Sequence, residues 1–130
     1  MTTNSDKLKN KLTADEVNRY WDVYFAVVDT LFIAQGRLRG LEDRATDLGD
    51  RSGYRADRLR VEADIELMRA KRMAFNANRS PISPPDQQTV DEVVALSKRV
   101  ADKTVTRGQA AAIVQIAADV VNEFKKLQNV

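Results

Sequence analysis

The residues best placed to do chemistry in this chain are four carboxylates near its middle: Glu42, Asp43, Asp47 and Asp50. Spacings of three and four residues bring such side chains to one face of a helix, and carboxylate oxygens are ligands that Mg²⁺ takes in proteins. The cluster is therefore compatible with a Mg²⁺-dependent hydrolase built only from helices. Arg44 and Arg51 lie among the acids, however, so the interpretation that we favour is a salt-bridged helix surface.

The composition removes most other catalytic options, because the chain contains no histidine and no cysteine. Imidazole bases, thiol nucleophiles, imidazole or thiolate metal sites and disulfides are all excluded. The sequence also contains neither the phosphate-binding P-loop pattern nor the dinucleotide-binding glycine pattern. We therefore expect a protein that is not an enzyme, with no cofactor, no catalytic residues and no metal ligands.

A basic segment offers a second kind of chemistry, since it carries four cations without an intervening acid: Arg69, Lys71, Arg72 and Arg79. The cations stand next to Phe75, and cations beside an aromatic ring are typical of surfaces that contact phosphates and stack on bases. Short basic runs are more often solvated helix faces, and no helix-turn-helix pattern accompanies this one. Nucleic-acid binding is therefore an alternative function and not the leading one.

Large apolar side chains offer a third kind of site, on a helix predicted to begin near Thr13. Its main stripe has spacings of three and four residues and comprises Val17, Tyr20, Tyr24, Val27, Leu31, Ala34, Leu38, Leu41, Ala45 and Leu48. Trp21, Phe25 and Phe32 widen the apolar surface beside this stripe, so the helix needs more than one neighbour. We predict that these three residues bind a partner, with a core position as the alternative for Trp21. Periodicity alone fits an internal core and an external partner equally.

The elements that must position these residues are predicted from caps and turn formers. Thr13 and Glu16 match a capping box, which starts the first helix. Residues 49–53 concentrate turn formers, so a chain reversal is expected there. A second helix should then run from about residue 55 to 78. Its apolar positions are Val61, Ile65, Met68 and Phe75, with Leu59 and Leu67 beside them.

Three prolines within residues 81–85 cannot continue a helix, so they separate the first two helices from the C-terminal third of the chain. A third helix is expected over residues 84–103, with Ser83 as its cap. Thr106 and Gln109 match another capping box, which should start a fourth helix. The apolar positions of that helix are Ile113, Ile116, Val120, Phe124 and Leu127.

These four helices predict an all-α fold, an antiparallel helical bundle of two helical hairpins with the first hairpin longer than the second. We predict a flexible N-terminal segment over residues 1–12 and a single helical domain over residues 13–130. Within that domain, residues 13–79 form the long hairpin, 80–86 the Pro-rich connector and 87–130 the short hairpin. If the long hairpin extends beyond the short one, part of the apolar surface of the long hairpin is not buried by the other helices.

The overall composition fits this fold class and restricts the compartment. Charged residues make up 31% of the chain and the net charge is only +2, so the global charge does not by itself indicate nucleic acid. No stretch of about 20 apolar residues is free of charge, and the first residues are polar where a secretory signal would be apolar. We expect a soluble cytoplasmic protein without a membrane span.

The leading hypothesis is a protein–protein interaction module that uses an apolar helical face. Such a module would act as an adaptor, a chaperone, an inhibitor or an assembly subunit, and its partner would be another protein or a second copy of the chain in a homo-oligomer. The alternatives are the nucleic-acid accessory protein and the Mg²⁺-dependent hydrolase.

Overall fold

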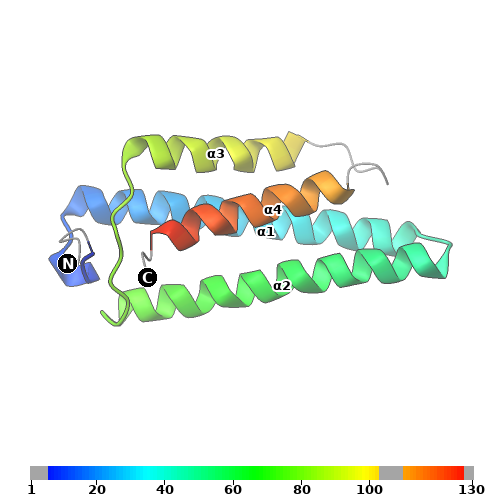
Figure 1. The fold of residues 1–130 in the computed structure, drawn as a ribbon, viewed down its shortest axis with the longest axis horizontal. Helices are drawn as coiled ribbons and strands as arrows, with labels where there is room; N and C mark the ends of the chain where they lie inside the picture. The colour runs from blue at the N-terminus through cyan, green and yellow to red at the C-terminus, as the bar shows by residue number, and fades with distance from the viewer. Residues whose placement is uncertain (1–5, 103–109, 128–130) are drawn as a thin grey trace.

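The computed structural model describes residues 6–102 and 110–127, and these form an all-α four-helix bundle (Figure 1). Two long helices, α1 (Ala14–Arg44) and α2 (Leu48–Asn76), are followed by two shorter ones, α3 (Gln87–Asp102) and α4 (Ala110–Lys126). A single turn of 3-10 helix, η1 (Lys9–Lys11), precedes them. Successive helices run in opposite directions, and the turn between α1 and α2 lies beyond the ends of the shorter pair (Figure 1). The predicted fold class is confirmed.

The start of α1 shows the capping box that the sequence predicted. The Thr13 hydroxyl accepts a hydrogen bond from the Glu16 amide at 3.2 Å, and the Glu16 carboxylate accepts one from the Thr13 amide at 2.9 Å. Two amides that lack a partner within the helix are satisfied in this way. From there α1 continues through Gly36 and Gly40 to Arg44.

The reversal between the long helices lies earlier than predicted. The prediction of a turn over residues 49–53 is wrong, because the chain reverses at residues 45–47 and α2 begins at Leu48. The side chain of Asp47 accepts a hydrogen bond from the Asp50 amide at 3.0 Å and caps the helix there. Gly49 and Gly53 therefore lie inside the first turns of α2. Gly53 costs about 1 kcal/mol relative to alanine, whereas a Cβ atom on Gly49 would lie only 3.1 Å from the capping carboxylate of Asp47.

The start of α3 also differs from the prediction. Asp86, and not Ser83, caps this helix, because its carboxylate accepts from both the amide and the hydroxyl of Thr89, at 2.8 Å and 2.9 Å. The Ser83 amide instead donates to the Leu127 carbonyl at 2.6 Å. The predicted capping box of Thr106 and Gln109 lies outside the described residues.

The connector between the two hairpins is held by backbone hydrogen bonds as well as by its prolines. Lys7 and Ile82 exchange two of them, at 2.8 Å and 2.9 Å, in an isolated antiparallel bridge. Ile82 is fully buried. Lys7, in the segment that the sequence suggested to be flexible, thus lies against the connector.

The core is built around α1, which contacts all three other helices. The apolar stripe is buried from Tyr20 to Leu41, whereas its last member, Leu48, is exposed. The main apolar positions predicted for the second and fourth helices are buried, whereas Leu59, beside the stripe of α2, is 52% exposed. Tyr20 stacks on Phe75 with 3.9 Å between ring centroids. The stripe is therefore intramolecular core along most of its length. No described helix is both long and apolar enough to cross a membrane.

Candidate functional site

One side of the α1–α2 hairpin is covered by the shorter helices. Arg37 of α1 donates to the Ala101 carbonyl of α3 at 2.8 Å, and Asp64 of α2 is within electrostatic reach of Lys125 of α4. The opposite side is here called the outer face. Its residues recur at spacings of three, four and seven on each helix, namely Trp21, Phe25, Val28, Phe32 and Arg39 on α1 and Arg55, Glu62, Glu66, Arg69 and Met73 on α2.

The apolar end of the outer face exposes large side chains. Phe25 is 53% exposed, Phe32 is 45% exposed and Met73 is 69% exposed, although phenylalanine and methionine are among the residues most often buried. Trp21 differs from them because it is only partly exposed and packs against the core. Its ring stacks on Phe25 at 5.7 Å and meets Phe75 edge-on at 5.4 Å. Trp21 therefore supports the Phe25 ring from the core side.

Phe32 stands between two shallow hollows. One, of about 370 Å³, lies toward α2 and is lined by Gln35, Glu62, Ile65, Glu66 and Arg69 as well as Phe32. The other, of about 330 Å³, continues along α1 past Gly36 and Gly40. A Cβ atom placed on Gly36 would meet no other atom within 4 Å, so this part of the helix surface is open.

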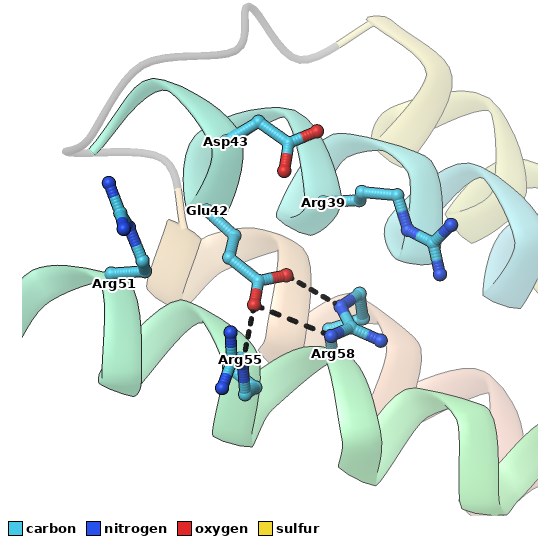
Figure 2. Close-up of a pocket in the computed structure, with 6 residues that line it drawn as sticks. All are labelled: Arg39, Glu42, Asp43, Arg51, Arg55 and Arg58. Atoms are coloured by element: carbon cyan, nitrogen blue, oxygen red, sulfur yellow. Dashed lines mark hydrogen bonds and ion pairs between the residues drawn. The ribbon is translucent and has the colours of Figure 1, made fainter.

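The polar end of the outer face is a pocket of about 560 Å³ beside the α1–α2 turn, shown in Figure 2. It is lined by Arg39, Glu42 and Asp43 of α1 and by Arg51, Arg55 and Arg58 of α2. The Glu42 carboxylate points toward α2 and accepts from the Nε groups of Arg55 and Arg58 at 2.7 Å and 2.8 Å (Figure 2). Arg58 also donates to Glu62 at 3.0 Å, so it joins two carboxylates.

These contacts fix the charge states at the base of the pocket. Hydrogen bonds from Arg58 and from Arg55 lower the pKa of Glu42 to about 2, despite the opposing effect of burial. The same contacts, with Glu42 first and Glu62 second, raise the pKa of Arg58 above its already high value. Glu42 therefore remains a carboxylate through neutral and mildly acidic pH, neutralised by arginine.

The four carboxylates suggested by the sequence do not assemble a metal site. Glu42 is buried against two arginines, Asp47 caps α2, and Asp43 is an exposed residue on the wall of the pocket. Within residues 6–102 and 110–127, no three carboxylates are placed to hold a metal ion together. The favoured interpretation of a salt-bridged surface holds for Glu42, although its partners are Arg55 and Arg58 and not Arg44 and Arg51, on which the interpretation was based.

The basic segment is divided between two sides of α2. Arg69 is 55% exposed and forms an ion pair with Glu66 at 2.7 Å on the outer face. Lys71 comes two residues later and therefore lies roughly 200° around the helix from Arg69, whereas the exposed Arg72 lies about 60° from Arg69. Arg79 lies beyond the end of α2, where its amide donates to the Ala74 carbonyl. The segment does not present its four cations on one helix face.

The sequence prediction did not identify the arginine pocket. Arg51, Arg55 and Arg58 succeed one another at spacings of four and three, and this signal would have placed them on one helix face. The predicted turn over residues 49–53 concealed it, because that turn would have removed Arg51 from the helix.

No family model matches this chain, and no curated protein or solved structure matches it either. Its function is therefore inferred from the geometry and charge of the outer face.

Proposed function

We propose that this chain is a non-enzymatic interaction module that binds another protein through the apolar end of its outer face. Adaptors, chaperones, inhibitors and assembly subunits all work by such binding. The observation that carries the proposal is the exposure of Phe25 and Phe32 on one helix face, at 53% and 45%, beside a core that buries most of the apolar stripe. Exposed apolar side chains that gather on one surface mark interaction sites.

The area available at these residues is sufficient to contribute to affinity. A phenylalanine side chain buries roughly 150–250 Å² when it is fully covered, so each half-exposed ring offers on the order of 100 Å² more. At about 25 cal/mol per Å², covering one ring contributes roughly 2 kcal/mol to association. The hollows on either side of Phe32 would receive apolar side chains of the partner, and Glu66 with Arg69 supplies a polar rim.

The partner is another protein or a second copy of this chain, since both would cover the same side chains. The nucleic-acid alternative is less well supported, because Arg69 is already paired with Glu66 and Lys71 lies on a different side of α2. The hydrolase alternative is also less well supported, because the Glu42 carboxylate is already engaged by two arginines.

The decisive experiment replaces Phe25 or Phe32 by aspartate and measures capture of protein from a lysate of the source organism. We expect each charge to abolish capture, because an unpaired carboxylate cannot be desolvated at an apolar interface. Helix content should stay unchanged, since both side chains are about half exposed. Self-association is measured in parallel by sedimentation, and a dimer that dissociates in both variants identifies the second copy as the partner.

Leu48→Asp is the matched control, because Leu48 is also a large apolar residue, 74% exposed, at the far end of the hairpin. Capture should persist in this variant. Loss of helicity in Phe25→Asp or Phe32→Asp would show that these residues belong to the core. Equal capture by wild type and all three variants, with no self-association, would contradict the proposed face.

A further inference from the structure

The pocket beside the α1–α2 turn has a net positive charge. Four arginines and two carboxylates line it, and Glu62 beside it pairs with Arg39 and Arg58, so this group of residues has a formal charge of +1. Arg58 is only 14% exposed and is engaged by Glu42 and Glu62, so its role is to support the base of the pocket. Arg39 and Arg55 are 58% and 60% exposed, so their guanidinium groups reach solvent.

The exposed arginines keep donor groups beyond their contacts within the protein. A guanidinium group carries five N–H donors in a fixed planar arrangement. Arg55 donates its Nε–H to Glu42 at 2.7 Å, and Arg51 donates from Nη2 to the Ala45 carbonyl at 2.8 Å. Each contact holds the side chain in place, which reduces the entropy lost when a ligand is bound.

We propose that this pocket binds a small organic phosphate. The phosphoryl oxygens accept hydrogen bonds from Arg51 and Arg55, which lie four residues apart on one face of α2, and Arg39 adds positive charge from α1. The pocket, of about 560 Å³, has the size of small-molecule sites and exceeds what one phosphate group needs. Asp43, on the α1 wall, accepts a hydrogen bond from a hydroxyl of the organic part.

The proposal is independent of the apolar end of the outer face, and calorimetric titration tests it separately. The probes are ribose 5-phosphate and inorganic phosphate, each titrated at an ionic strength matched with sodium chloride. We expect ribose 5-phosphate to bind more tightly than inorganic phosphate. Arg51→Gln and Arg55→Gln should each weaken binding of ribose 5-phosphate about tenfold, because each removes a charged hydrogen bond.

Arg69→Gln is the matched control, because Arg69 has nearly the exposure of Arg55 and also pairs with a glutamate at 2.7 Å. The affinity of the Arg69→Gln variant for ribose 5-phosphate should equal that of wild type. Arg51→Gln keeps the test valid if Arg55→Gln fails to fold. Among the described residues, the hydrogen bond given for the Arg51 side chain goes to a backbone carbonyl and not to a buried carboxylate.

Three results would overturn the proposal. One is the absence of any heat of binding at millimolar ribose 5-phosphate. Another is an equal loss of affinity in Arg51→Gln, Arg55→Gln and Arg69→Gln, which would indicate unspecific attraction to a basic surface. The third is tighter binding of a single-stranded oligonucleotide that Arg69→Gln also weakens, which would identify a nucleic-acid surface instead.

Discussion

Glu42 is a buried carboxylate on α1 whose charge is balanced by side chains of α2. Because the ion pairs with Arg58 and Arg55 cross between the helices, they hold α1 and α2 together beside the turn. Breaking a buried pair by removing one partner leaves the other charge without compensation. At the residue scale, Glu42 is thus the side chain on which the geometry of the arginine pocket depends.

Glu42→Gln is expected to destabilise the fold in a pH-dependent way. The pKa of Glu42 is lowered to about 2 from its ordinary value of 4.5, so the ionised carboxylate stabilises the folded state above about pH 4.5. This stabilisation is lost as the pH falls toward 2. Urea unfolding at pH 7 should show a lower midpoint for the variant than for wild type, and the gap should narrow steadily between pH 5 and pH 3.

Glu66→Gln is the comparison for that experiment. Glu66 also forms an ion pair with an arginine, but its side chain is 67% exposed, and exposed pairs contribute about 0–1 kcal/mol. At pH 7 the urea midpoint of this variant should therefore be close to that of wild type. A gap between Glu42→Gln and wild type that stays constant from pH 7 to pH 3 would contradict the role given to the Glu42 charge.

Tyr20 offers a second prediction at the residue scale, because its hydroxyl is buried without a hydrogen-bond partner among the described residues. Burial raises the pKa of the Tyr20 hydroxyl, as expected for a group removed from water, and the nearby Tyr24 raises this pKa further by a smaller amount. Tyr20→Phe should therefore raise the free energy of unfolding by about 1 kcal/mol, since it removes a polar group that loses its hydration on folding. Thermal and urea unfolding measure the change.

Tyr24→Phe provides the contrasting variant for Tyr20. The Tyr24 hydroxyl donates to the Met68 carbonyl at 3.2 Å, so its removal deletes a hydrogen bond between α1 and α2. This variant should lose about 1 kcal/mol of stability. If both variants were destabilised equally, the Tyr20 hydroxyl would have a partner, such as a buried water molecule.

At the scale of the elements, local signals predicted most of the helical structure. The capping box at Thr13 and Glu16 needs only residues that are close in sequence, so the sequence was sufficient to locate it. The apolar positions of α2, such as Val61 and Met68, were predicted correctly because burial on one face repeats with the helical period. Patterns of this kind are contained within one helix and need no knowledge of its neighbours.

The errors arose where two local signals compete and a distant contact decides between them. Ser83 and Asp86 are both good caps, and the amide of Ser83 is bound by Leu127, which is distant in sequence. The sequence also left open whether Phe25, Phe32 and Trp21 are exposed or buried, because the answer depends on which sides of α1 the other helices cover. The arginine pocket likewise required the correct position of the turn.

The cap at Asp47 determines where the turn lies, and it can be tested at this scale. Asp47→Ala should lower the free energy of unfolding by about 1 kcal/mol, because the Asp50 amide loses its acceptor at the start of α2. Asp47→Ser should keep most of the stability, since serine is an equally good cap. Thermal unfolding of the two variants gives the comparison, and equal melting temperatures would show that the cap contributes nothing.

At the scale of the whole molecule, the outer face combines two different surfaces on one side of the long hairpin. Phe25 lies in the first half of α1 and Phe32 near its middle, and the arginine pocket lies beside the turn. The rise along α1 to Arg39 is about 21 Å from Phe25 and about 10 Å from Phe32. The separation lets the two proposed activities be tested by different variants, because a substitution at one surface leaves the side chains of the other in place.

The backbone hydrogen bonds of the connector have a consequence for how the bundle opens. Lys7 binds Ile82, and Ser83 binds Leu127, so residues from the beginning, middle and end of the described chain meet at one end of the bundle. The short hairpin is thereby closed where the chain enters α3 and where it leaves α4. Contacts between such distant residues form late in folding, after loop closure has been completed. Transient opening of the native protein should therefore begin with these long-range contacts, while the ion pairs of Glu42 still hold α1 and α2 together beside the turn.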